Sequence, residues 1–269
     1  MSVESSAPRE SWWGKYPLAP DTGARWTLGP LRLGAERFPG EVRLSWRNVG
    51  GPEKTEIVTA ASCSGNPHEE GAELGRFALE DTDVALTLHP TLPDRAIVAR
   101  PDTPLWVLGR QRVDLFVSVP LWAEVYLPGG PAPVLAVPSL RLSDTWFGAS
   151  PRDGELCYSS RTQARLDVTK LPRHPVRAVT RVTINNRRPA AMRVERIKLP
   201  TPLLGLYATP DHRFWTSSIE LRPTATDNAT SVHLRPPKGL TDDLFELVSP
   251  PRRQQHANIF DRALSALVG

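Results

Sequence analysis

Apolar and polar residues alternate with a period of two along much of this chain, and no other feature limits the fold as strongly. Successive side chains of a β-strand point to opposite faces of its sheet, so a strand with one buried face has an apolar residue at every second position. The pattern recurs in segments 42–46, 84–88, 113–119, 121–127, 162–168, 176–184, 215–221 and 232–234. The sequence therefore predicts a chain built from many short, half-buried strands.

Proline and glycine separate these segments. The chain has 28 prolines, a residue that cannot donate to a strand ladder or continue a helix. Turn-forming sequences stand at 50–52, 128–131 and 185–189. Near Met192 the apolar phase slips by one residue, which predicts a β-bulge at Glu195-Arg196. We expect an all-β fold with two antiparallel β-sandwich-like halves.

The expected division has four parts. An N-terminal extension covers residues 1–21, a first β domain 22–138, a second and basic β domain 139–236, and a proline-rich linker with a short amphipathic C-terminal helix 237–269. Asn258 is a suitable N-cap for that helix. Its apolar face, spaced as in a helix, consists of Ile259, Phe260, Ala263, Leu264 and Leu267. Such a helix either docks on its own domain or contacts a partner.

Positive charge is concentrated in the second predicted domain. Residues 139–200 carry 13 basic and 5 acidic side chains, a net charge of +8, whereas the whole chain carries +4. By strand parity Arg161 and Arg165 share one face, as do Arg177 and Arg181, and two more arginines follow at Arg193 and Arg196. A basic face could bind nucleic acid, an acidic protein or an anionic membrane surface. The alternative is a solvated face whose arginine stems cover apolar edges.

No catalytic, cofactor or metal-binding motif is found. The phosphate-binding, dinucleotide-binding and HExxH patterns are missing, and the two cysteines, Cys63 and Cys157, lack the spacing of zinc ligands. We expect Cys157 to be buried; as a nucleophile it would need a histidine in space, such as His174, His212 or His233. Neither a signal peptide nor an apolar run of about 18 residues is present, so the predicted location is cytoplasmic.

The eight tryptophans allow a carbohydrate-stacking interpretation. Parity assigns Trp46 to the apolar face of its strand, and Trp26 and Trp215 stand beside other core residues. We therefore expect the tryptophans to be packed in a core. Candidate exceptions are Trp12, Trp13 and Trp122.

The block from Asp144 to Tyr158, followed by the strand 176–184, Asn185-Asn186 and the strand 192–200, is similar to a prokaryotic and mainly archaeal family, domain of unknown function 432. The segment 13–16 (WGKY) resembles the opening of that family, and the match would span about residues 12–235. Phe147 stands where the family pattern has tyrosine. The resemblance implies no reaction. It does imply a genomic association with small-conductance mechanosensitive channels.

Together these observations predict a non-catalytic cytoplasmic interaction or accessory protein without a cofactor. Its partner is expected to be a protein, with a membrane protein such as a mechanosensitive channel, or an anionic surface, as one possibility. The expected contact residues are the six arginines of the basic face and the five apolar residues of the C-terminal helix. The alternatives are a nucleic-acid-binding module that uses the arginine-rich half and an enzyme of unrecognised type.

Overall fold

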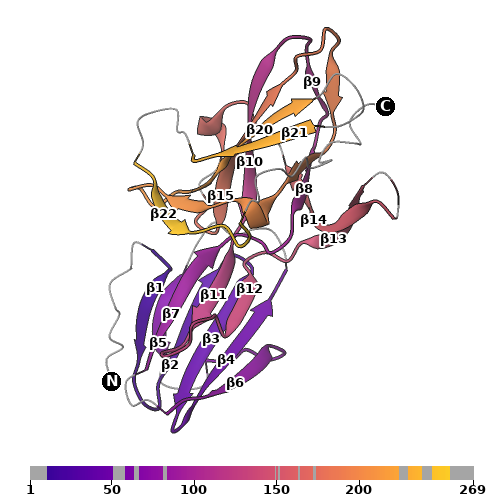
Figure 1. Ribbon diagram of the computed structural model, residues 1–269. Helices are drawn as coiled ribbons and strands as arrows, with labels where there is room; N and C mark the ends of the chain where they lie inside the picture. The colour runs from indigo at the N-terminus through magenta and orange to yellow at the C-terminus, as the bar shows by residue number, and fades with distance from the viewer. Residues whose placement is uncertain are drawn as a thin grey trace. The chain divides into compact units, whose positions relative to one another are not determined.

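A computed structural model of the chain describes residues 11–50, 58–63 (backbone alone), 67–80, 84–148, 150, 152–162, 164–171, 174–223, 230–237 and 244–254 (Figure 1). The described residues form β-strands and two 3-10 turns and contain no α-helix, so the all-β prediction is confirmed for them. The predicted C-terminal helix with Ile259, Phe260, Ala263, Leu264 and Leu267 lies outside the described residues and stays a prediction.

The chain divides into two compact units. The first consists of Met1–Thr91 and Leu121–Arg141, and the second of Leu92–Pro120 and Leu142–Gly269. The alternating segments at 42–46, 84–88, 113–119 and 232–234 lie in strands, as predicted, and those at 121–127 and 176–184 do so except at their ends. Segment 215–221, predicted as one strand, is divided at Ser217 between two strands. Within the part of the chain that the structure describes, no helix has the length and apolar character needed to cross a bilayer.

Two antiparallel sheets make up the first unit. One contains, in spatial order, β1 (Gly14–Leu18), β7 (Val84–Thr91), β11 (Trp122–Tyr126) and β12 (Leu135–Pro138). The other contains β5 (Val58–Cys63), β2 (Gly23–Leu28), β3 (Leu31–Phe38), β4 (Glu41–Asn48) and β6 (Glu73–Ala78). All their strand pairs are antiparallel.

The alternation predicted from the sequence explains the core of the first unit. The core-facing residues of β2, β3 and β4 are almost wholly buried and include Trp26, Leu28, Leu33 and Leu44. Tyr16 of β1 packs edge-to-face against Trp26 of β2, with ring centroids 5.2 Å apart. This contact joins one sheet to the other, as in a sandwich. The opposite face of β2, β3 and β4 bears mainly polar residues.

The second unit has three sheets. The largest contains β21 (Thr230–Arg235), β20 (Ser218–Pro223), β15 (Arg177–Asn185), β19 (Phe214–Thr216), β18 (Leu206–Ala208) and β22 (Glu246–Ser249), with β10 (Arg112–Pro120) paired to β15. A four-stranded sheet contains β13 (Ser143–Gly148), β14 (Gly154–Thr162), β8 (Ile97–Pro101) and β17 (Ile197–Leu199). The third pairs β16 (Met192–Val194) with β9 (Leu105–Val107). The 3-10 turns are η1 (Val168–Lys170) and η2 (Thr201–Leu203).

Two of these sheets are mixed, whereas the sequence predicted antiparallel sheets throughout. β15 runs parallel to β19 and β20, and β14 runs parallel to β8. Alternation reports which face of a strand is buried but carries no information about strand direction. The parallel pairs join strands that lie far apart along the chain, which short hairpin turns cannot do.

The observed units differ from the contiguous division expected from the sequence. Residues 92–120 belong to the second unit because all nine residues of β10 pair with β15. The second unit also extends beyond residue 236, because β22 pairs with β18. The end of the described chain is held there too: the Arg252 side chain donates to the Leu92 carbonyl at 2.7 Å, and the Arg253 amide donates to the Pro202 carbonyl at 2.9 Å.

Two local predictions were wrong. Segment 162–168 is not a strand: β14 ends at Thr162, Arg165 forms an isolated bridge with Phe116, and η1 begins at Val168. Asp167 caps that turn by accepting the Thr169 amide at 2.9 Å, a local bond that competes with strand pairing. The phase slip at Glu195-Arg196 is a strand break rather than a bulge, since β16 and β17 belong to different sheets.

Candidate functional site

The six arginines expected to form one basic face are distributed over several elements. Arg177 and Arg181 lie on the same face of β15, and the bridge between Arg165 and Phe116 places Arg165 in the row of Arg181, because Phe116 also pairs with Arg181. By contrast, Arg161 lies on β14 in the four-stranded sheet, next to Arg100 of β8. The two remaining arginines, Arg193 and Arg196, lie on β16 and just after it.

On the face of β15 that bears Arg177 and Arg181, a carboxylate neutralises the charge of Arg181 at one end. Arg181 Nη2 lies 2.6 Å from Asp114 Oδ2 on β10, and the Thr183 hydroxyl donates to Asp114 Oδ1 at 2.5 Å. Burial raises the pKa of Asp114, but the hydrogen bonds from Arg181 and Thr183 and the nearby guanidinium charges outweigh it, so the net pKa lies below the ordinary value. Arg181 therefore serves mainly to hold β10 against β15.

A second ion-pair group lies further along the same sheet. Glu220 of β20 pairs with Thr183 of β15, and Arg222 makes two hydrogen bonds to its carboxylate at 2.9 and 3.0 Å. Arg235 of β21 approaches the same carboxylate at 3.6 Å. The Arg222 hydrogen bonds are the main reason why the pKa of Glu220 is lowered, against the effect of burial. These arginines are likewise paired within the fold.

The other end of the β15 face carries a different arrangement. Arg177 Nε donates to the Ser118 hydroxyl at 2.7 Å, and Arg177 Nη2 donates to the Ser118 carbonyl at 3.0 Å, so β10 fixes this guanidinium. β15 pairs with β19 in parallel, with Ala178 opposite Phe214. Arg177 and Arg213 immediately precede this pair of residues along their strands. Like charges repel each other, and an anion between them would offset that repulsion.

The turn from β18 to β19 is tied by Thr209. The Thr209 hydroxyl donates to Asp211 Oδ1 at 2.6 Å and accepts the Arg213 amide at 3.2 Å. His212 has a φ of +58°, in the left-handed region, and its amide donates to the Thr209 carbonyl at 2.9 Å. The turn thereby places His212 and Arg213 next to each other in a fixed backbone geometry.

A cavity of about 250 Å³ opens at this end of the sheet. Its polar lining comes from Arg177, Arg213, His174, His212, Asp211 and Ser118, and its apolar lining from Leu171, Pro175, Val179 and Phe214. We call it the β15 cavity. Among the described residues, its lining carries two guanidinium groups, two imidazoles and one carboxylate. Such a set of donors can bind an oxyanion through charge-assisted hydrogen bonds.

Sequence reasoning found only part of this cavity. Arg177 was among the predicted basic residues, but Arg213 was not. The sequence analysis considered His174 and His212 as partners for Cys157, which lies instead on β14 of another sheet. There Cys157 is fully buried in an apolar cluster with Ala96, Val98 and Phe147, as expected for a structural cysteine.

The tryptophans are only partly as expected. Trp26 and Trp215 are buried, but so is Trp12, which was a candidate exception. The exposed tryptophans are Trp106 on β9 and Trp146 on β13, at 60% and 45% exposure. Strand parity did not indicate this exposure, because β9 has only three residues and β13 lies at the edge of its sheet.

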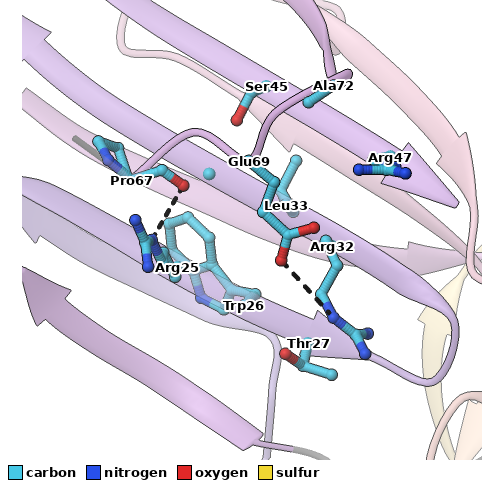
Figure 2. Close-up of a pocket in the computed structure, with 11 residues that line it drawn as sticks. Arg25, Trp26, Thr27, Arg32, Leu33, Ser45, Arg47, Pro67, Glu69 and Ala72 are labelled. Carbon is cyan, nitrogen blue, oxygen red and sulfur yellow. Dashed lines mark hydrogen bonds and ion pairs between the residues drawn. The ribbon is translucent and has the colours of Figure 1, made fainter. Parts of the chain in front are cut away.

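A second cleft lies on the polar face of the first unit (Figure 2). Arg25 of β2 donates to the Pro67 carbonyl at 3.0 Å, and Arg32 of β3 lies 3.9 Å from Glu69. Arg47 of β4 donates to the Glu70 carbonyl. These arginines hold segment 67–72, which we call the strap, against three strands of the sheet.

His68 of the strap contacts a serine and a glutamate, as in a hydrolase. His68 Nδ1 lies 2.7 Å from Ser45 Oγ, and Nε2 lies 3.2 Å from Glu36 Oε2. However, the cleft measures only about 40 Å³, which is much too small for a substrate. Burial is the main reason why the pKa of His68 is lowered, and Glu36 partly opposes it. We interpret this group as an anchor for the strap.

The fold and the β15 cavity thus define an all-β protein with a basic cavity in its second unit. A sequence model of the family described as "Protein of unknown function (DUF432)" matches residues 12–266, and the chain belongs to that family. The match extends well beyond the expected end near residue 235, so the C-terminal tail is part of the family domain. Comparisons with curated proteins and with solved structures gave no match.

Proposed function

We propose that this protein is a non-catalytic cytoplasmic binding protein whose second unit recognises an anionic group at the β15 cavity. The observation that carries the proposal is that Arg177 and Arg213 both line that cavity. An anion bound between Arg177 and Arg213 would offset the repulsion between the two guanidinium groups.

The proposal favours recognition over catalysis. Arg177 is fixed by two hydrogen bonds of its guanidinium to Ser118, so this donor is held in place before a ligand arrives, and the Thr209 turn fixes the backbone of Arg213. Preorganised donors reduce the entropic cost of binding. An accessory role beside a membrane protein such as a mechanosensitive channel would place the anionic group on that protein or on a lipid headgroup.

The test compares two variants of equal net charge. Arg177→Gln/Arg213→Gln removes two charges from the cavity, and Arg152→Gln/Arg235→Gln removes two exposed charges elsewhere in the same unit. Thermal unfolding is followed as phosphate, sulfate or citrate is added at constant ionic strength. Such anions also stabilise proteins by exclusion from the surface, and both variants share that effect.

We expect the anions to raise the unfolding temperature of the wild type and of the control pair more than that of the cavity pair. Equal shifts in all three proteins would overturn the proposal. The nucleic-acid alternative predicts that the protein retains single-stranded DNA at low salt and releases it steeply as the salt concentration rises. If both variants retain DNA equally poorly, the DNA binds to a diffuse basic surface rather than to the cavity.

The tail is a second proposed contact. A chain that ends at Gln254 keeps the Arg252 and Arg253 bonds to the second unit and lacks the predicted helix. If the apolar face of Ile259, Phe260, Ala263, Leu264 and Leu267 binds a partner, this truncation loses the partner from a native membrane extract but keeps the anion-induced shift. An unchanged recovery of the partner would exclude the tail as a contact.

A further inference from the structure

We infer that the first unit binds a neutral saccharide in another cavity, which measures about 370 Å³. The described residues that line it all belong to the first unit and come mainly from the ends of β4 and β12, so we call it the β4–β12 cavity. The inference goes beyond the proposed function and does not depend on it. It rests on an indole, a carboxylate and a guanidinium in the lining.

The β4–β12 cavity lies where the core of the first unit opens. Strand register places Trp46 on the same face of β4 as Leu44 and opposite Leu33 of β3, and both leucines are buried. Trp46 itself is only partly buried. Val137 and Pro138 of β12 line the cavity from the other sheet. The core-facing row of β4 thus continues into a space that the described residues leave open.

The indole of Trp46 has a fixed position beside this space. A Cβ atom at Gly75 of β6 would lie 3.3 Å from Cζ3 of Trp46, so one edge of the indole packs against β6 where no side chain stands. Trp46 also lines the cavity. The C–H groups of a pyranose ring form an apolar face, and such a face packs on the electron-rich face of an aromatic ring.

The start of β6 reverses the usual order of apolar and polar residues. Glu73 pairs with Trp46 and therefore stands on the core-facing side of the sheet, whereas Leu74 faces the other way and is 53% exposed. A sequence that served the fold alone would have the leucine inside and the carboxylate outside. Local departures from the pattern of the fold are expected at functional sites.

The polar groups of the lining suit a ligand with hydroxyl groups. Glu73 can only accept hydrogen bonds and Arg141 can only donate them, and both side chains line the cavity and are exposed. Within the described part of the chain, neither side chain has a hydrogen bond or an ion pair. A sugar hydroxyl both donates and accepts, so neighbouring hydroxyls can serve both groups.

The charges favour a neutral ligand. Glu73 and Arg141 carry opposite charges, and Arg47, which also lines the cavity, donates to the Glu70 carbonyl of the strap. An anion would meet the Glu73 carboxylate, and a cation would meet Arg141. A neutral saccharide meets neither repulsion. Because β6 and β12 are the edge strands of their sheets, a saccharide reaches the cavity without displacing a strand.

Calorimetric titration of the full chain with maltotriose, cellotriose and chitotriose tests the inference. We expect at least one of these saccharides to bind. Glu73→Gln should weaken that binding about tenfold, because a hydrogen bond to a charged acceptor is stronger than one to an amide. The control Glu80→Gln removes the same charge from an exposed position just after β6 and should leave the affinity unchanged. Trp46→Leu should abolish binding, but since Trp46 is partly buried, the Glu73 variant is the safer test.

The outcomes separate this inference from the proposed function, which is tested by anions at the β15 cavity. If none of the three saccharides binds, the inference is wrong and the proposed function is unaffected. If a saccharide binds equally well to wild type and Glu73→Gln, it does not bind in the β4–β12 cavity. Binding of the zwitterion glycine betaine in place of the saccharides would also overturn the inference.

A comparison of chain lengths identifies the source of the saccharide. Equal affinity for the trisaccharide and for its monosaccharide would indicate a free sugar. Affinity that rises with the number of sugar units would indicate a polysaccharide or a glycan. Both results support a saccharide site.

Discussion

Two of the clefts in the described part of the molecule use arginine in different ways. On the first unit, Arg25 and Arg47 donate to carbonyl oxygens of the strap, and Arg32 lies near its Glu69 carboxylate. The remaining space measures about 40 Å³. In the second unit, Arg177 and Arg213 line a cavity of about 250 Å³. The chain supplies the oxygens in the first case. In the second, Ser118 accepts two hydrogen bonds from Arg177, and we propose that the cavity binds an anion in addition.

This difference shows why arginine content is a poor guide to a binding site. A guanidinium has five donors in a planar fork and binds a backbone carbonyl, a carboxylate or a phosphate with similar geometry. Whether it serves the fold or a ligand depends on which oxygen the fold brings within reach. The comparison can be tested by disturbing each region separately.

The largest effect is expected where the strap lies closest to the sheet. A Cβ atom at Gly34 would lie 2.6 Å from Ser45 Oγ and 2.8 Å from the Pro67 carbonyl oxygen, so Gly34→Ala must displace the strap. We expect the free energy of unfolding, measured by urea denaturation, to fall by about 2–3 kcal/mol. In the control Gly130→Ala, the new Cβ would lie no closer than 3.6 Å to its neighbours.

The control should stay within about 0.5 kcal/mol of the wild type. Anion binding at the β15 cavity should be unchanged in the folded Gly34 variant, because that cavity is lined only by residues of the second unit. If Gly34→Ala has no effect on stability, the strap is not held tightly against the sheet, and the interpretation of His68 as an anchor is wrong.

The sequence was sufficient to place several of the strands because strand parity is a local property. Each of β4, β7, β10 and β15 could be recognised from its own residues. The pairing of strands could not be predicted in the same way. β10 and β15 pair across a long stretch of chain, with 67 positions between Arg181 and its partner Asp114, and nothing in either segment specifies the other.

The candidate site depends on pairings between strands that are distant in the sequence, so most of it could not be predicted from the sequence. Arg177 and Arg213 become neighbours only through the parallel pairing of β15 with β19, a strand direction that alternation does not encode. Likewise, Ser45 and His68 meet because the strap folds back over β4. What the sequence did indicate was a local excess of positive charge, which is visible without any knowledge of the fold.

A smaller effect is expected from Asp114→Asn, which tests whether Arg181 belongs to the fold. The substitution weakens the contacts with Arg181 and Thr183, and since Asp114 is partly exposed we expect a loss of about 1–2 kcal/mol at pH 7. The pKa of Asp114 is lowered in the folded state, so its contribution to stability is fully present above the ordinary carboxyl value of 3.8 and is lost as pH falls through the folded value.

Urea denaturation at pH 7 and at pH 3 measures this dependence. The difference between wild type and Asp114→Asn should be largest at pH 7 and smaller at pH 3. A difference that stays the same at both pH values would mean that the Asp114 charge does not stabilise the pair. If the variant also lost the stabilisation by added anions, the distinction between Arg181 and the arginines of the cavity would not hold.

The smallest effect is expected at Arg193, one of the residues that the sequence assigned to a basic contact face. Arg193 lies 2.5 Å from Glu195, but both side chains are nearly half exposed, at 47% and 43%. Exposed ion pairs contribute little because solvent screens them, so Arg193→Gln should change the free energy of unfolding by less than about 0.5 kcal/mol. The stabilisation of this variant by added anions should equal that of the wild type. If Arg193→Gln instead reduces that stabilisation as much as Arg177→Gln/Arg213→Gln, recognition depends on the summed positive charge of the second unit, and the cavity lined by Arg177 and Arg213 is not what binds the anion.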